Sequence, residues 1–308
     1  MHHIMTTKTK IYFLFISLIF SLPAIAQTHQ INLAKLAEEK KIIQQLVVFN
    51  NEKAQLPIVK LTSLNIASVD LDFQFSNVFD SIANKFTKVE TLKNSYTSTK
   101  VTSLNALNDD LKLYNYVILK TSKPLNNDLV NFIKEIEKTK QVVVALTGAF
   151  DQSAFKAFQS PVIISPSTNS ISAACLAQFI FGAIVRNGDP IRLKYTVPEE
   201  VGININDLDS IGLIVKQAIA AKGAPGAVVM VVKDGKVIFN NAYGKHTYAG
   251  NREMRIQDIF DMASVTKVAA TTVATMDLYE KGDLNIDQTI GTYIAQTREM
   301  TEKKTVTL

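Results

Sequence analysis

The stretch 114–146 of the sequence reads YNYVILKTSKPLNNDLVNFIKEIEKTKQVVVAL. Its two ends, 114–120 and 142–146, are short apolar runs of the kind that form strands buried on both faces. Between them, 125–139 carries apolar residues at helical spacing, namely Leu129, Phe132, Ile133 and Ile136. A buried strand, a helix and a second buried strand in this order predict a unit of parallel sheet.

The same alternation extends in both directions from this stretch. The pattern predicts strands over 64–71 and 161–164, and helices over 78–92 and 170–185. A short helix is expected around Phe155 and Phe158. Strands of continuous apolar character separated by helices indicate an α/β class fold, a mainly parallel α/β sandwich domain over 27–195.

The region 196–308 has a different pattern. Apolar residues at helical spacing predict a helix over 207–222, and Gly223 follows it. Two apolar runs, 227–232 and 237–239, flank Asp234-Gly235, which is a strong hairpin signal. A polar stretch over 242–258 then leads into a second helix that runs to about Glu280. We expect an α+β domain here.

The six residues Met262-Ala263-Ser264-Val265-Thr266-Lys267 stand in the first turn of that second helix. Ser264 precedes Lys267 by three positions, just under one helical turn, so hydroxyl and amine lie on one face within reach of each other. A lysine amine whose pKa is lowered by burial can take the proton of a serine and so make it a nucleophile. The positive field of a helix N-terminus favours the developing oxyanion.

The setting of Ser264 distinguishes it from a second Ser-x-x-Lys, Ser153 to Lys156. The 264–280 helix is apolar on nearly all sides, which is typical of a helix inside a domain, so we expect Lys267 to be buried. We interpret Ser153 as the exposed start of a connecting helix, where serine is usually a cap. The alternative interpretation of Ser264 is also structural: a serine that caps the start of its helix, followed one turn later by a solvated lysine.

From about Pro198 onward the chain resembles the N-terminal part of the β-lactamase-related serine hydrolases, the group of class C β-lactamases, penicillin-binding proteins and related esterases. The residues that carry the resemblance are Pro225-Gly226, Asp234-Gly235-Lys236-Val237, Ala242-Tyr243-Gly244, the run 260–267 and Lys281-Gly282-Asp283-Leu284. The resemblance implies Ser264 as the acylated nucleophile and Lys267 as its proton acceptor. It implies acyl transfer from an amide or ester, with cell-wall peptides, β-lactams or small esters as substrates.

The family pattern also places a tyrosine motif and a Gly-containing strand well downstream of the serine. Neither Tyr96-Thr97-Ser98 nor Leu146-Thr147-Gly148 substitutes for them, since the first is misplaced and the second is a strand end. We therefore expect an incomplete β-lactamase-like domain over 196–308, with impaired activity because half of the oxyanion hole is lacking. We also expect the apolar face of the 264–280 helix to lack the protein surface that normally packs against it.

The unit 27–195 resembles the C-terminal α/β sandwich domain of family 3 glycoside hydrolases. The resemblance rests on Leu36-Ala37-Glu38-Glu39-Lys40, Leu56-Pro57-Ile58, the run 178–184 and Gly188-Asp189-Pro190. In that family the nucleophilic carboxylate belongs to a preceding barrel. Glycoside hydrolysis needs a pair of carboxylates, but we interpret the acidic pair Asp109-Asp110 as solvated surface in a polar turn. The chain is thus expected to be part of a glycosidase–serine hydrolase fusion. The alternative function is a non-catalytic or vestigial carbohydrate-associated protein.

The N-terminus has the features of a secretory signal peptide. Lys8 and Lys10 precede an apolar run over 11–20, and Ala24-Ile25-Ala26 gives a small-residue cleavage site. We expect cleavage after Ala26, export to the periplasm or the exterior, and no membrane span after cleavage, because the apolar run is short for crossing a bilayer.

The composition excludes several function classes. Removal of 1–26 takes away two lysines and no acidic residue, which lowers the formal charge from +5 to +3. No basic block supports nucleic-acid binding. Cys175 is predicted to be a buried structural thiol, and His246 a loop residue. No residue spacing indicates a metal or a cofactor site, so the expected partner is a small-molecule or peptide substrate of the peptidoglycan type.

Overall fold

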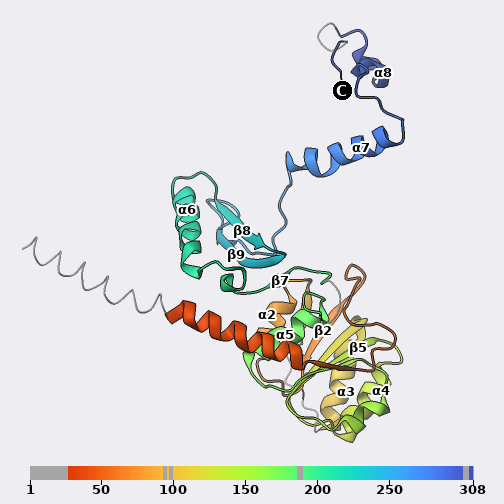
Figure 1. Ribbon diagram of the computed structural model, residues 1–308. Coiled ribbons are helices and arrows are strands. Elements are labelled where there is room, and N and C mark those ends of the chain that lie inside the picture. The colour runs from red at the N-terminus through yellow and green to blue at the C-terminus, as the bar shows by residue number, and fades with distance from the viewer. Residues whose placement is uncertain (1–26, 93–95, 97–99, 186–189, 301–304, 308) are drawn as a thin grey trace, which may run out of the picture. The chain divides into compact units, whose positions relative to one another are not determined.

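The computed structural model describes residues 27–92, 96, 100–185, 190–300 and 305–307 (Figure 1). Contacts divide the chain into two compact units, the first ending at Ile256 and the second comprising 257–308. The signal peptide predicted over 1–26 lies outside the described residues. The domain boundary predicted between 195 and 196 stays a prediction.

A six-stranded sheet forms the centre of the first unit. Its strand order is β1-β6-β5-β4-β2-β3. All neighbours pair in parallel except β1, which pairs antiparallel with β6 at one edge. The strands are β1 (Val47–Phe49), β2 (Ile66–Asp70), β3 (Val89–Thr91), β4 (Tyr116–Thr121), β5 (Gln141–Thr147) and β6 (Val162–Ser165). The mainly parallel sheet confirms the predicted α/β fold class.

Helices cover both faces of this sheet (Figure 1). Alternate strand residues point to opposite faces, so Ile118 packs on one side and Val117 and Leu119 on the other. The first core takes in the helix over 27–45, α2 (Ser76–Ala83) and α5 (Ser170–Ile180). The second core takes in α3 (Val101–Asp110), α4 (Asn127–Ile136) and the 3-10 turns η1 (Leu111–Leu113) and η2 (Gln152–Ala157). Cys175 is fully buried in the first core, as predicted.

Several elements differ from the sequence prediction, among them two helices of the first unit. The helix predicted over 78–92 ends at Ala83, and β3 occupies the end of the predicted range. The side-chain oxygen of Asn84 accepts a hydrogen bond of 3.0 Å from the backbone N–H of Val89. This bond turns the chain back into the sheet. The helix α3 is absent from the sequence prediction, although its signal is there: the buried residues Leu104, Leu107 and Leu111 stand at helical spacing.

A second, three-stranded sheet has the order β7-β9-β8. The strands β8 (Gly226–Lys233) and β9 (Lys236–Gly244) form the predicted antiparallel hairpin, and β7 (Lys194–Tyr195) pairs in parallel with β9. At the hairpin turn Asp234 has φ 50° and Gly235 has φ 70°, the two positive angles that a tight hairpin turn requires. Two 3-10 turns, η3 (Pro198–Val201) and η4 (Ile205–Leu208), lead into the predicted helix α6 (Asp209–Ala220).

The second unit consists of short elements. A π-helical segment η5 (Lys267–Thr272) continues directly into α7 (Val273–Glu280), and α8 (Ile290–Tyr293) and a 3-10 turn η6 (Ala295–Thr297) follow. One isolated bridge joins Thr289 to Thr307. In the part of the chain that the structure describes, no helix combines the length and apolarity needed to cross a bilayer.

Candidate active site

The side chains of Ser264 and Lys267 meet at the start of the helical segment 265–280. The Nζ of Lys267 donates a hydrogen bond of 3.0 Å to the Oγ of Ser264. Residues three positions apart on a helix are neighbours on its surface, so this contact follows directly from the sequence spacing. The chemical roles of the two residues stay predictions.

The backbone just before Ser264 is strained. Ala263 has a positive φ of 41°, a conformation that costs an L-residue about 1–2 kcal/mol. A carboxylate oxygen of Asp261 accepts the N–H of Ala263 at 2.9 Å, and the N–H of Val265 donates to the carbonyl of Met262 at 2.9 Å. These two bonds close a tight turn that presents Ser264 ahead of the first helical residue.

The helix after Ser264 begins in an unusual conformation. Residues Lys267–Thr272 are π-helical, and π segments are rare and frequently lie at functional sites. The hydroxyl of Thr272 donates to the carbonyl of Lys267 at 2.8 Å. A side-chain donor thus satisfies a carbonyl at the point where the helix changes its hydrogen-bonding period.

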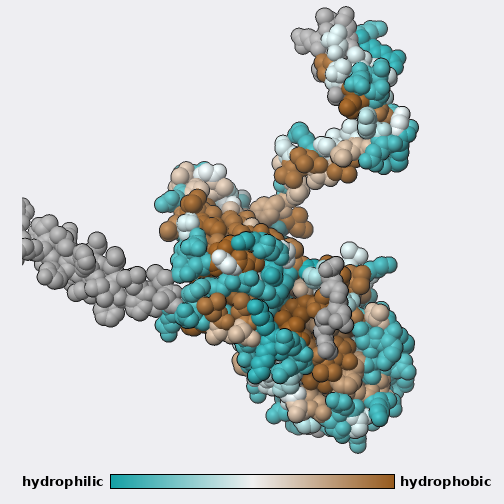
Figure 2. All heavy atoms as spheres, viewed as in Figure 1, coloured by the Kyte–Doolittle hydropathy of each residue, from teal (hydrophilic) through white to brown (hydrophobic). Residues whose placement is uncertain are grey.

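The expected burial of this helix and of Lys267 is wrong for the described chain. Ser264 and Lys267 are both exposed, and so are the apolar side chains around them, with Val268 at 71% and Ile259 at 99%. Figure 2 shows hydrophobic side chains on the surface of this helix. The physical reason is size: the unit 257–308 contains only short elements, which offer no second layer against a helix that is apolar on nearly all sides.

This exposure limits what the pair can do chemically. In the observed contact the lysine is the donor, whereas a lysine that takes the serine proton must first be neutral. Removal of the amine from water is the effect that favours the neutral form. The pair therefore has the geometry of an activated nucleophile, and its reactivity depends on a surface that covers it.

The serine of the second Ser-x-x-Lys is not the cap of its turn, because the N-cap of η2 is Asp151. The backbone N–H of Ser153 donates to one carboxylate oxygen of Asp151 at 2.9 Å, and its hydroxyl donates to the other at 2.7 Å. These two hydrogen bonds lower the pKa of Asp151. Ser153 lies in the exposed turn η2, as predicted.

Three other residues singled out in the sequence, Asp109, Asp110 and His246, lie outside any site. Asp109 and Asp110 end helix α3 instead of standing in a polar turn, so that part of the interpretation is wrong, although Asp109 is exposed as expected. Asp110 accepts a hydrogen bond from the hydroxyl of Tyr96. His246 follows β9 in a loop, where its N–H donates to the carbonyl of Arg252 at 3.0 Å.

Sequence reasoning missed a polar network that joins the N-terminal helix to the segment after the first sheet. Lys194 bridges Glu39, at 2.6 Å, and Glu200, at 2.8 Å. The carboxylate of Glu199 accepts a hydrogen bond of 3.1 Å from Nδ2 of Asn32, and its other oxygen lies 3.0 Å from Nδ1 of His29. These partners are far apart in sequence and carry no shared motif, so no sequence signal pairs them. Among the described residues, no group of His, Cys, Asp or Glu side chains is arranged to hold a metal.

The C-terminal part of the chain is related to known hydrolases. Residues 213–308 match the family model described as Beta-lactamase. An N-acetylmuramyl-L-alanine amidase of Bacillus subtilis is 33% identical over 35% of this chain and 26% of its own length. A putative D-alanyl-D-alanine carboxypeptidase of Escherichia coli O157:H7 is 29% identical over 33% of this chain and 25% of its own length. The chain spans about a quarter of the length of these curated relatives.

Among solved structures, the chain is similar to family 3 glycoside hydrolases. A β-glucosidase of Listeria innocua aligns with a TM-score of 0.38 and 15% identity, over 47% of this chain and 25% of its own. A family 3 β-N-acetylglucosaminidase of Paenibacillus aligns with a TM-score of 0.36 and 10% identity, over 48% of this chain and 30% of its own.

Proposed function

We propose that this protein is a serine hydrolase of the β-lactamase-related group, in which Ser264 is the nucleophile and Lys267 its proton acceptor. The observation that carries the proposal is the 3.0 Å contact between Lys267 Nζ and Ser264 Oγ. It lies inside the range 213–308 that matches the β-lactamase family. The strained turn at Ala263 supports it, because backbone strain clusters at active sites.

The proposed reaction has two steps. In the first, neutral Lys267 takes the hydroxyl proton of Ser264, Oγ attacks the substrate carbonyl, and the leaving amine or alcohol departs with a proton returned by Lys267. In the second, water hydrolyses the ester on Ser264 and releases the acid. Since the neutral amine requires removal from water, the substrate or a further protein surface must cover the pair for the first step.

The proposed substrate is an amide of the peptidoglycan type. The support comes from the relatives, whose names are those of an N-acetylmuramyl-L-alanine amidase and of putative D-alanyl-D-alanine carboxypeptidases. We accordingly place a peptide ending in D-alanyl-D-alanine ahead of small esters as a first substrate for assay. No step of this mechanism uses a metal or an organic cofactor.

A fluorescent penicillin and a fluorophosphonate probe test the nucleophile. We expect covalent labelling of the full chain by at least one probe, loss of labelling in Ser264→Ala, and unchanged labelling in the matched control Ser153→Ala. Labelling that persists in Ser264→Ala, or that disappears equally in Ser153→Ala, would overturn the assignment. Absence of labelling by both probes would count against acyl transfer altogether.

The exposure of Ser264 and Lys267 favours a second candidate function. An exposed pair without a covering surface suits the non-catalytic alternative, in which the chain is a carbohydrate-associated protein without hydrolase activity. The same probes separate the two candidates, because this second one predicts no labelling of Ser264 under any condition.

We further propose that the protein is exported. The support is the pattern of residues 1–26, with a basic start, an apolar run and Ala24-Ile25-Ala26. Expression in a Gram-negative host should yield a periplasmic chain whose N-terminal residue is Gln27, as measured by intact mass. A cytoplasmic chain that keeps Met1 would contradict the proposal.

A further inference from the structure

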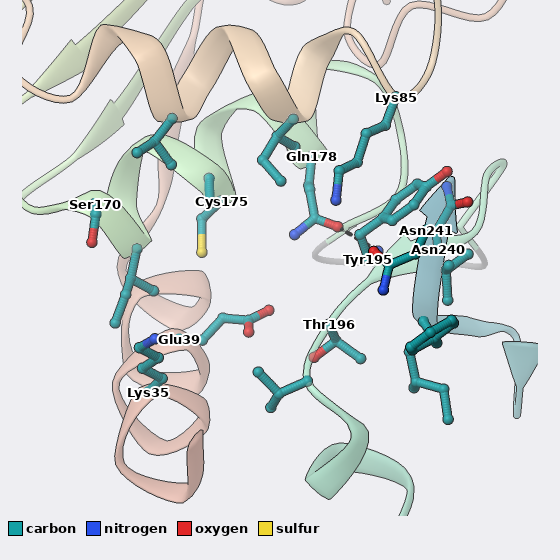
Figure 3. A pocket seen from close by; sticks show the side chains of 18 residues that line it. Lys35, Glu39, Lys85, Ser170, Cys175, Gln178, Tyr195, Thr196, Asn240 and Asn241 are labelled. Atoms are coloured by element: carbon teal, nitrogen blue, oxygen red, sulfur yellow. Dashed lines mark hydrogen bonds between the residues drawn. The ribbon is translucent and has the colours of Figure 1, made fainter. Parts of the chain in front are cut away.

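A cavity of about 590 Å³ lies in the first unit, within the size range of small-molecule sites. It is lined by the helix over 27–45, α2, α5, β7 and β9 (Figure 3). Apolar side chains of α2 and α5 line one side, and β9 with the segment after β7 contributes both apolar and polar side chains. The cavity is in a different unit from Ser264, so what it binds is independent of the hydrolase proposal.

One side of the cavity presents an acceptor without a donor. In the described structure the Oδ1 of Asn240 is buried and makes no hydrogen bond. Burial raises the pKa of the neighbouring Tyr195 hydroxyl, and the side chain of Asn240 acts in the opposite direction. A buried acceptor left without a donor is costly. A ligand hydroxyl would supply the missing donor.

Lys85 brings an ammonium to the same cavity. Its Nζ lies 4.4 Å from the centre of the Tyr195 ring, and Figure 3 shows its side chain pointing along that ring. Burial lowers the pKa of Lys85, and no carboxylate among the described residues forms an ion pair with it. A charged group that is partly desolvated and lacks a counter-ion is a ready partner for an anion.

The acidic residue of the cavity does not serve as that counter-ion. Glu39 extends from the N-terminal helix on the opposite side (Figure 3), and its carboxylate lies 2.6 Å from the ammonium of Lys194. Burial raises the pKa of Glu39, although Lys194 acts in the opposite direction. With Glu39 paired and Lys35 also lining the cavity, the net charge offered to a ligand is positive.

We propose that this cavity binds a small hydroxylated carboxylic acid, with its carboxylate on Lys85 and a hydroxyl donating to Oδ1 of Asn240. The apolar wall takes the carbon skeleton, and the ring of Tyr195 lies next to the carboxylate end. The two polar contacts select for a molecule that carries both groups, and they discriminate against neutral polyols and against simple carboxylates.

D-Glucuronate, D-glucose and acetate test this assignment on the full chain, with binding followed by ligand-observed NMR and calorimetry. Glucuronate and glucose differ mainly in a carboxylate against a hydroxymethyl group, so they isolate the contact to Lys85. We expect glucuronate to bind at least about tenfold more tightly than glucose and acetate, the discrimination that one charge-assisted hydrogen bond supports. Lys85→Met should remove this preference, and Asn240→Leu should weaken glucuronate binding.

The control variant is Lys88→Met, which removes a lysine three residues away whose side chain is 88% exposed. It should bind glucuronate like the parent chain. Equal binding of all three ligands, binding of none, or equal losses in Lys85→Met and Lys88→Met would overturn the proposal. Circular dichroism of each variant establishes that its fold is intact, and Lys85→Arg, which keeps the charge, should retain part of the preference if Lys85→Met proves unstable.

Discussion

The ammonium of Lys120 lies 2.6 Å from a carboxylate oxygen of Asp80 in the interior of the first unit. The Lys120 side chain has no exposed surface, and it also donates to the hydroxyl of Ser76 at 2.7 Å. Asp80 accepts a further bond of 2.6 Å from Ser68. Burial lowers the pKa of Lys120, against the effect of Asp80 beside it. The ion pair thus joins β4 to α2 beneath the helix layer.

Substitution Lys120→Met should destabilise the protein strongly, because it leaves Asp80 buried without its cation. Breaking a buried pair from one side costs about 3–5 kcal/mol of unfolding free energy. Urea unfolding measures the loss. The matched control is Lys138→Met, which breaks the exposed pair with Glu135 and should cost less than about 0.5 kcal/mol. Similar losses in both variants would show that Asp80 does not depend on Lys120.

Substitution Gly235→Ala should destabilise the β8–β9 hairpin through backbone conformation alone. Gly235 has φ 70°, and an added Cβ would meet no atom within 4 Å. The expected cost is about 1–2 kcal/mol, the penalty of an L-residue in this region. Thermal unfolding of the two proteins provides the measurement. Because no contact is lost, an unchanged midpoint would mean that the hairpin turn has another conformation in solution.

Acidification should loosen the contact between the N-terminal helix and η3 through Glu199. Burial alone would raise the pKa of Glu199, but hydrogen bonds from His29, Ile205 and Asn32 outweigh it and lower the pKa below 4.5. A carboxyl with a lowered folded-state pKa stabilises the fold above its unfolded pKa. That contribution is lost as pH falls through the folded value.

The variant Glu199→Gln tests this pH dependence. It should be less stable than the parent at neutral pH, and the difference should shrink as pH falls below 4.5. Glu39 has a raised pKa and acts in the opposite direction in both proteins, so the difference between the two curves isolates Glu199. If the difference in unfolding free energy between the two proteins stays constant down to about pH 3, protonation of Glu199 is not coupled to unfolding.

Substitution Asp261→Ala should slow probe labelling of Ser264 by about three- to tenfold, since a misplaced nucleophile loses much of its reactivity. The reason is that Asp261 holds the N–H of Ala263 in the turn before the serine. Asp261→Asn keeps an acceptor oxygen at that position and should label at nearly the parent rate. A rate that falls equally in both variants would point to the charge of Asp261 instead of its hydrogen bond.

Limited proteolysis should cut the chain after Ile256 before it cuts elsewhere. The second unit exposes large apolar side chains along its main helix, including Val268 and Val273, and such surfaces accompany low local stability and association. By contrast, 194–201 is held to the N-terminal helix by the ion pairs of Lys194. Mass spectrometry of early fragments locates the cuts. First cuts before Pro198 would contradict this order.

Sequence patterns predicted the parts of the fold in which a single local signal decides the structure. Continuous apolar runs identified β4 and β5, and Asp234-Gly235 identified the hairpin. The spacing of Ser264 and Lys267 predicted their contact, because helix geometry alone brings residues three apart together.

The features that were missed depend on distant parts of the chain. Strand β1 is three residues long and exists because it pairs with β6, more than one hundred residues later. The exposure of Lys267 depends on what else packs against its helix, and an apolar pattern predicts a preference for cover without supplying the cover. The cavity beside Lys85 is likewise assembled from five separate elements, so no window of sequence contains its signal.

The parallel pairing of β7 with β9 imposes an order on folding. A hairpin such as β8–β9 closes in microseconds from local contacts, whereas a parallel partner must return from a distant point in the chain. During synthesis, β7 leaves the ribosome directly after α5, at a time when β9 has not been made. The three-stranded sheet can therefore be completed only after β9 has been made. Substitutions that slow assembly of the first sheet should delay the pairing of β7 with β9, and leave the closure of the hairpin itself unchanged.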